Sequence, residues 1–225
     1  MLAGAARERA MTIELYGYKY SVYAWIARLA LCEKGCAYDW REVNPFADNV
    51  PADYLIRHPF KRVPVLVHDD FVLYETSAIT RYVDEAFDGP SLQPAVPRER
   101  ARAQQIISVI DSYAYWPLVR QVFSHGVFRQ RTGRESDPSE VQRGLDAAPR
   151  VIGALEDLAG EGRFLCGDAL SLVDIHLAPM VGYFTLMPEG TALLNRHRRL
   201  TRWRAAMSER AAFKATTPDL PPAPA

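Results

Sequence analysis

The first part of the chain alternates short apolar segments with one longer amphipathic segment. Residues 12–16 form a short apolar stretch that is typical of a strand. Residues 21–34 carry apolar side chains at helical spacing, with Ser21 at the N-cap position and Gly35 just past the end. The pattern therefore predicts a strand followed by a helix that is capped at both ends.

The pattern continues through a second strand, a short helix, a hairpin and another helix. The hairpin is indicated by two apolar runs that flank Asp69 and Asp70. The expected elements are strands at 37–43, 63–67 and 71–74 and helices at 52–57 and 77–86. This order of elements predicts a small α/β domain.

A segment rich in proline and glycine interrupts this pattern. Asp88, Gly89 and Pro90 follow the last helix, and such residues favour a domain boundary. Beyond it only helical patterns occur, at 98–123, 139–159, 172–186 and 193–208. We therefore expect an α/β domain over 11–88, an all-helical domain over 98–217, and flexible tails at 1–10 and 218–225. Met1 and Met11 are both candidate starts.

Composition narrows the class of protein. The 225 residues contain 27 Lys plus Arg and 27 Asp plus Glu, and this balance argues against nucleic acid as a partner. Three cysteines do not form a secreted disulfide framework, and the five histidines suggest no metal site. Because no apolar run could span a bilayer and no secretory signal is visible, we expect a cytoplasmic protein without a membrane partner.

Pro64 opens a predicted interior strand, which is unusual because proline cannot donate to a sheet ladder. One interpretation is a cis peptide bond that turns the backbone groups of Val63 outward, where they could pair with a peptide-like ligand. The other is a trans proline on an edge strand. The spacing alone does not decide between them.

Glu75 and Thr76 follow the hairpin and open a helix. The carboxylate could accept from an amine, while the free N–H groups of the helix and the Thr76 hydroxyl could donate to a carboxylate. The alternative is a plain capping turn with a solvated Glu75.

Farther along the chain, Ser171 and Asp174 form a capping box, which we interpret as a feature that stabilises the fold.

Four segments in order resemble the glutathione transferase family. Residues 15–35 match the family's first strand, active-site loop and first helix, and residues 58–66 (HPFKRVPVL) match its cis-proline segment. Residues 75–82 (ETSAITRY) match its γ-glutamyl-binding turn, and residues 164–179 (FLCGDALSLVDIHLAP) match the capping segment of its central C-terminal helix. The resemblance is to serine-type cytosolic members, similar to the bacterial phi and theta classes.

This resemblance implies a thioredoxin-like α/β domain followed by an all-α helical domain. It also implies glutathione as co-substrate and attack of its thiol on a hydrophobic electrophile, in a homodimer that serves detoxification. Rival functions on the same fold are a glutathione-dependent peroxidase, isomerase or dehalogenase, and a non-catalytic protein that binds glutathione or hydrophobic ligands.

Ser21 aligns with the family's catalytic serine, and a hydroxyl donor at a helix N-terminus suits the stabilisation of a thiolate. Val22 follows it where many members have proline. Because other classes use a tyrosine near the end of the first strand, Tyr16, Tyr18 and Tyr20 are competing candidates.

The same resemblance assigns the residues that bind glutathione. Val63 would pair its backbone with the cysteinyl part, and Glu75 and Thr76 would hold the γ-glutamyl end. Arg62 occupies a position near the glycyl carboxylate, where a cation is expected. Lys61 stands where the family often has glycine, so which of the two cations faces glutathione stays open.

The electrophile would lie against the second domain. An aromatic stripe on the helix at 98–123 supplies the candidates Tyr113, Trp116 and Val119, although ordinary core packing explains most such stripes. Asp111 lies on the same helix, and in some classes an acid there reaches the neighbouring subunit's glutathione.

Overall fold

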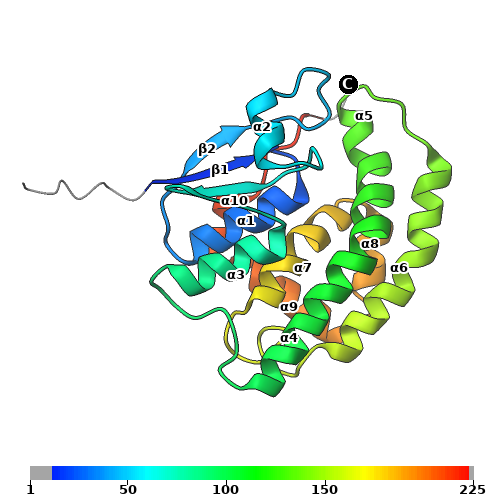
Figure 1. Ribbon diagram of the computed structural model, residues 1–225. Coiled ribbons are helices and arrows are strands. Elements are labelled where there is room, and N and C mark those ends of the chain that lie inside the picture. The colour runs from blue at the N-terminus through cyan, green and yellow to red at the C-terminus, as the bar shows by residue number, and fades with distance from the viewer. Residues whose placement is uncertain (1–11, 223–225) are drawn as a thin grey trace, which may run out of the picture.

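The computed structural model describes residues 12–222 of the chain, so the predicted tail at 1–10 lies outside the described residues. A four-stranded sheet forms the first part of the fold (Figure 1). Its order is β2-β1-β3-β4, in which β1 and β2 are parallel and the other pairs are antiparallel. The strands are β1 (Ile13–Gly17), β2 (Asp39–Glu42), β3 (Val65–His68) and β4 (Phe71–Tyr74).

Helices cover both faces of this sheet. Leu15 points from β1 into the main core, which includes α1 (Val22–Glu33) and α3 (Thr76–Ala86). The next residue, Tyr16, points to a smaller cluster on the other side, where α2 (Ala52–Arg57) contributes a buried tyrosine. This alternation follows from the two-residue period of a strand, so each strand serves two apolar layers.

Helix α1 has the two caps that its sequence predicts. Ser21 Oγ accepts a hydrogen bond from Ala24 N at 3.3 Å. At the other end Gly35 adopts a φ of 68°, a backbone conformation that glycine reaches without steric cost. Cys36 N donates to Leu31 O at 2.9 Å and so closes the last turn. The predicted helix is confirmed, and its N-terminus is fixed by local sequence.

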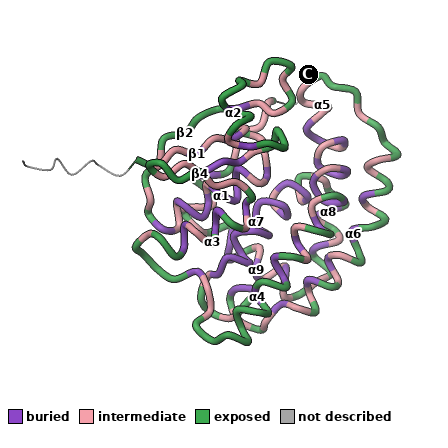
Figure 2. The backbone as a smooth tube through the Cα atoms, in the orientation of Figure 1, coloured by how far each residue is buried: buried purple, intermediate pink, exposed green. Residues whose placement is uncertain are grey.

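The second part is a bundle of helices in which α7 lies at the centre. Nearly every side chain of α7 is buried, and Figure 2 shows the buried backbone concentrated around α7 and α1. A long rod of three consecutive helices passes beside it (Figure 1). The helices are α4 (Pro97–Val109), η1 (Ile110–Phe128), α5 (Arg129–Arg131), α6 (Pro138–Leu158), α7 (Leu172–Phe184), α8 (Pro188–Leu194), α9 (Arg198–Glu209) and α10 (Ala211–Thr216).

Two predicted helices differ from the structure. The helix expected at 98–123 continues to residue 131, and its middle segment η1 is a π-helix, which closes hydrogen bonds between residues five apart. The helix expected at 193–208 is divided, because Arg196 N and His197 N bond back to Leu193 O and Leu194 O and end α8 in a tight turn. Helix α10 was not predicted.

The two parts are joined by buried polar contacts. Trp25 Nε1 in α1 donates to Thr216 Oγ1 in α10 at 3.1 Å. Tyr183 OH in α7 donates to Tyr20 O at 3.1 Å, in the loop that precedes α1. Because these bonds are made by buried side chains, they fix α1 and the loop before it against the helical bundle.

The segment after α10 differs from the flexible tail expected at 218–225. Over its described part, 218–222, Leu220 packs against the core and Pro221 O accepts a hydrogen bond from Arg131 Nη1 at 3.2 Å. The physical reason is that α10 directs this segment onto the end of α5, where an apolar contact and a charged donor are available. Within residues 12–222 no helix combines the length and the hydrophobicity needed to cross a membrane.

Candidate active site

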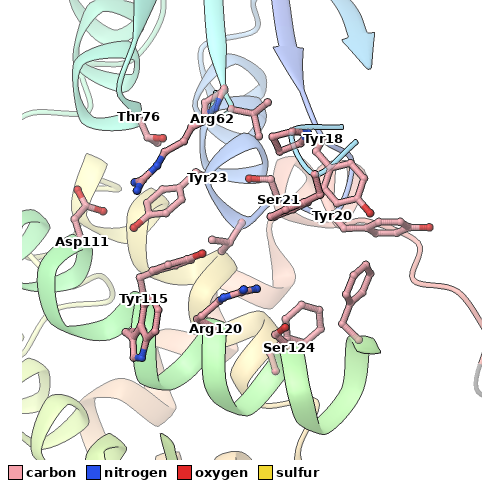
Figure 3. A pocket seen from close by; sticks show the side chains of 18 of the residues that line it. Tyr18, Tyr20, Ser21, Tyr23, Arg62, Thr76, Asp111, Tyr115, Arg120 and Ser124 are labelled. Atoms are coloured by element: carbon pink, nitrogen blue, oxygen red, sulfur yellow. The ribbon is translucent and has the colours of Figure 1, made fainter. Parts of the chain in front are cut away.

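A cavity of about 850 Å³ lies between the sheet domain and the helix rod. The loop before α1, the turn before β3 and the start of α3 form its upper wall, and η1 forms its lower wall (Figure 3). Ser21, Arg62, Val63, Glu75 and Thr76 all line it. Residues predicted from segments far apart in the sequence are therefore brought together in one cavity.

Ser21 lies at the point where the two walls meet. Its Oγ is used as an acceptor by Ala24 N, and no residue between 12 and 222 accepts a hydrogen bond from this hydroxyl. The proton of the hydroxyl is therefore available to a ligand in the cavity. The first N–H groups of α1 lie beside it, and a helix N-terminus favours negative charge.

The three competing tyrosines differ in their surroundings. Tyr16 does not line the cavity, and its OH donates to Glu14 Oε2 at 2.9 Å. Burial and this bond to Glu14 raise the pKa of Tyr16. Tyr18 and Tyr20 do line the cavity, and burial raises the pKa of Tyr18. Tyr16 is thus placed for a structural role, while Tyr18 and Tyr20 stay near Ser21.

The Val63–Pro64 peptide bond is cis. Strand β3 starts only at Val65, two residues later than its sequence predicted, because Val63 and Pro64 do not join the ladder. Among the described residues, Val63 N and Val63 O have no backbone partner, and Val63 faces the cavity. These two groups can therefore pair with an extended peptide-like ligand, as an added strand would.

Glu75 adopts a φ of 70°, an uncommon conformation for a residue with a side chain. Such backbones tend to occur at functional sites, where the surrounding structure maintains them. Here the conformation places Glu75 immediately before α3, whose first residue is the buried Thr76. The N-terminus of α3 has no side-chain cap, so its first N–H groups are free to bind a carboxylate in the cavity.

Lys61 and Arg62 both line the cavity but point in different directions. Lys61 Nζ donates to Ala47 O at 3.1 Å, in the loop after β2. The Arg62 side chain extends toward Thr76, and no residue from 12 to 222 forms an ion pair with it (Figure 3). The turn before Val63 thus directs the Arg62 side chain toward the residue predicted to hold the γ-glutamyl end. The assignment of Arg62 to the glycyl carboxylate stays a prediction.

Asp111 projects from η1 into the cavity of its own chain. Its Oδ1 lies 3.5 Å from Nδ1 of His176, a fully buried residue of α7, whose Nε2 lies 3.0 Å from Thr80 Oγ1 in α3. The carboxylate thus lies in front of the His176–Thr80 pair, and neither Asp111 Oδ1 nor His176 Nδ1 has a hydrogen-bond partner among the described residues. The cavity therefore has a second acid, besides Glu75, on the side of Thr76.

The predicted electrophile residues are divided by the structure. Trp116 lines the cavity, whereas Tyr113 and Val119 lie outside its lining: Tyr113 is 64% exposed and Val119 is 7% exposed in the core. The reason is that the prediction used the spacing of an α-helix, whereas η1 is a π-helix. A π-helix has more residues in each turn and rotates less per residue, so other side chains face the cavity. Single residues or adjacent pairs of η1, about four residues apart, face the cavity instead. The lining residues of η1 are Asp111, Ser112, Tyr115, Trp116, Arg120, Phe123, Ser124 and Phe128.

Both parts of the chain match models of one protein family. The model of the glutathione S-transferase N-terminal domain matches residues 15–91, and that of the C-terminal domain matches 138–206. Glutathione S-transferase F13 of Arabidopsis thaliana is 28% identical and spans 95% of this chain and 99% of its own. A glutathione S-transferase of Triticum aestivum is 32% identical over 74% of this chain and 76% of its own length.

A solved structure agrees with these matches. The theta class glutathione S-transferase from Xanthomonas axonopodis pv. citri, with glutathione bound, is 25% identical with a TM-score of 0.79. It covers 91% of this chain and 96% of its own. The chain belongs to the glutathione S-transferase family. Its thioredoxin-like sheet domain and all-helical domain confirm the predicted fold class, and glutathione is its co-substrate.

Sequence reasoning missed several residues of this glutathione transferase's cavity. Arg120 and Ser124 come from η1, and Arg129 and Arg134 come from the segment that follows it. These residues are four to five positions apart, and this spacing was the signal in the sequence that could have identified them. The spacing can be interpreted as one face of a π-helix only when the structure shows that this face lines a cavity. In the described part of the chain, no three His, Cys, Asp or Glu side chains gather in a group that could hold a metal ion.

Proposed function

We propose that this glutathione transferase joins the thiol of glutathione to a hydrophobic electrophile, with Ser21 as the residue that activates the thiol. The observation that carries this proposal is the free hydroxyl proton of Ser21, at the N-terminus of α1 and facing the cavity. A hydroxyl that already accepts one hydrogen bond can donate its proton to a thiolate, and the helix dipole favours the same charge.

The energetic requirement is modest. A free thiol has a pKa of about 8.5, so only a few per cent is thiolate at neutral pH. A hydrogen bond to a charged group contributes about 1.5–3 kcal/mol, which lowers the thiol pKa by about one to two units. The thiolate then attacks the electrophilic carbon to form a thioether, and no covalent bond to the enzyme is needed.

Residues of the first domain would position glutathione for this step. The backbone N–H and C=O of Val63 would pair with the cysteinyl part. Arg62 and the N-terminus of α3 at Thr76 would bind the γ-glutamyl carboxylate, and Glu75 would accept from its amine. Lys61, which contacts the loop carbonyl of Ala47, would bind the glycyl carboxylate.

The second domain would hold the electrophile. Tyr115, Trp116, Phe123 and Phe128 line that part of the cavity, opposite Ser21. Burial raises the pKa of Tyr115, so its phenol stays protonated at neutral pH and can donate a hydrogen bond to a substrate. Aromatic rings of this kind favour flat apolar substrates, which are the usual targets of detoxification.

Product analysis tests the proposed function. The purified protein is incubated with glutathione and a series of aryl halides, hydroperoxides and activated alkenes, and the products are identified by mass spectrometry. We expect thioether conjugates with loss of halide from the aryl halides. Glutathione disulfide as the sole product would indicate a peroxidase instead, and glutathione binding without any product would indicate a ligand-binding protein.

We further propose that the protein is a cytoplasmic homodimer. Ile56 in α2 and Phe60 in the following turn are 85% and 65% exposed, and a second copy of the chain would cover such apolar side chains. Sedimentation velocity at micromolar concentration should give the mass of two chains. A monomer under these conditions would contradict the proposed assembly but leave the chemistry of the cavity unaffected.

A further inference from the structure

The charged residues of the cavity are distributed unevenly between its two walls. On the side assigned to glutathione, two cations are balanced by two acids. These residues are Lys61, Arg62, Glu75 and Asp111. Glutathione carries two carboxylates and one ammonium group, so each of its charges meets an opposite charge on this side. The charges of glutathione are thus matched without any residue from the far part of η1.

The wall assigned to the electrophile is different. It carries Arg120, Arg129 and Arg134, and among the cavity-lining residues beyond Asp111 the described chain has no acid. Arg129 Nη1 already donates to Glu135 O at 2.9 Å, and Arg134 is exposed. The lining of this wall therefore carries an excess of positive charge, while Arg120 and Arg129 also border a neighbouring cavity lined by Glu135, Asp137 and Glu140. Arg120 is the half-buried member of the three for which no hydrogen bond forms within residues 12–222.

Arg120 is a half-buried cation without a protein partner. It extends into the cavity between Tyr115 and Ser124, across from Ser21 (Figure 3). No residue between 12 and 222 forms a hydrogen bond or an ion pair with its guanidinium. A partly desolvated guanidinium is costly unless it is paired, and its planar donors fit a carboxylate in a bidentate manner. The geometry thus calls for an anion at this point.

The surroundings of Arg120 restrict the shape of that anion. The rings of Tyr20 and Phe128 pack in a tilted arrangement with centroids 5.0 Å apart, and Tyr18 packs edge-to-face with Tyr20 at 5.4 Å. Trp116, four residues before Arg120 in η1, lines the same wall. The space between Ser21 and Arg120 is therefore bounded by aromatic rings, which favour a flat conjugated ligand.

We propose that the preferred second substrates are flat aromatic electrophiles that carry a carboxylate, and that Arg120 binds this carboxylate. The proposal rests on the proposed function, since it assigns a substrate class to the same cavity. The thiolate near Ser21 attacks the ring carbon, and Arg120 holds the opposite end of the ring. Arg120 acts as a specificity-determining residue that contacts substrate.

A pair of matched probes tests this. In para-chloro-meta-nitrobenzoate the thiolate sulfur bonds to the carbon that bears chlorine, and chloride leaves with the electron pair of the broken bond. The thiol proton has already passed to solvent. The corresponding benzamide has nearly the same shape but no charge. The kcat/KM of each probe is divided by its uncatalysed rate constant, which removes the difference in intrinsic reactivity between the two rings.

We expect the wild-type enzyme to favour the benzoate. The ratio of the two corrected kcat/KM values, benzoate over benzamide, should fall about tenfold in the Arg120→Gln variant. Arg102→Gln serves as the control, because Arg102 is an exposed arginine of α4 on the same rod and outside the cavity lining. It should keep the wild-type preference. An unchanged preference in Arg120→Gln would overturn the proposal, as would a selective rise in the KM for glutathione, which would assign Arg120 to the co-substrate.

A binding measurement separates this proposal from the proposed function. If neither probe is conjugated, the catalytic function fails, yet the anion site can still be tested with the unreactive meta-nitrobenzoate and meta-nitrobenzamide. Calorimetry in the presence of S-methylglutathione measures both affinities. A preference for the anion that is lost in Arg120→Gln supports the site, and equal affinities for the two ligands reject it.

Discussion

Replacement of Ser21 by alanine should raise the pKa of bound glutathione by about one to two units and lower kcat/KM at neutral pH about 10- to 100-fold. The reason is that Ser21 lies at the N-terminus of α1 and faces the cavity, and no residue between 12 and 222 accepts the proton of its hydroxyl. Thiolate absorbance, titrated against pH with glutathione bound, measures the shift directly.

The pH dependence gives a second readout. Because Ser21 lowers the thiol pKa, its contribution is largest below the pKa of free glutathione and disappears once that thiol ionises unaided. The rates of the wild type and of Ser21→Ala should therefore converge above about pH 9. A constant ratio between them at all pH values would show that Ser21 acts by some means other than thiolate stabilisation.

Matched variants separate activation from helix capping, since the Ala change also removes an N-cap that contributes about 1 kcal/mol. Ser21→Asp keeps an acceptor for Ala24 N but places a negative charge beside the thiolate, so it should retain stability and lose activity. Tyr16→Phe should leave the thiol pKa unchanged, because Tyr16 OH bonds Glu14 outside the cavity. If the shift survives in Ser21→Ala, Tyr18 or Tyr20 becomes the activating residue.

Replacement of Asp174 by alanine should lower the free energy of unfolding by about 3–5 kcal/mol. This fully buried carboxylate accepts four hydrogen bonds, from Leu165 N at 2.8 Å, Ser171 N and Ser171 Oγ at 2.7 Å, and Trp203 Nε1 at 2.9 Å. Removing it leaves several buried donors without an acceptor, which costs more than the loss of one neutral hydrogen bond. Urea unfolding, followed by tryptophan fluorescence at a fixed protein concentration, measures the change.

Asp168→Ala is the control for this experiment. Asp168 lies in the same loop before α7, is exposed, and accepts a single backbone bond from Arg163 N at 3.0 Å. Its loss should cost less than about 1 kcal/mol. Equal effects of the two substitutions would mean that the buried network around Asp174 contributes little beyond an ordinary turn. The sequence revealed only the capping box of this network, whereas Trp203 and Leu165 are brought to it by tertiary packing.

Local sequence was sufficient wherever neighbouring residues determine the structure. The caps at Ser21 and Gly35 fix the ends of α1, because a hydroxyl acceptor and a residue that tolerates positive φ act within one turn. The alternating pattern of β1 likewise fixes which side chains face each apolar layer. From such elements, in order and at characteristic spacings, the sequence also indicated the family and its fold.

Tertiary structure decided the features that depend on contacts between distant segments. The spacing around Pro64 left a cis and a trans peptide bond open, and the structure shows the cis bond. The pairing of β3 with β1 and β4 shows in addition that the ladder starts after Pro64. The stripe that suggested Tyr113 and Val119 assumed an α-helix. The structure shows that η1 is a π-helix, which turns Arg120 toward Ser21 instead. The face of a helix that lines a cavity is determined by how the whole helix packs, which a local sequence pattern does not specify.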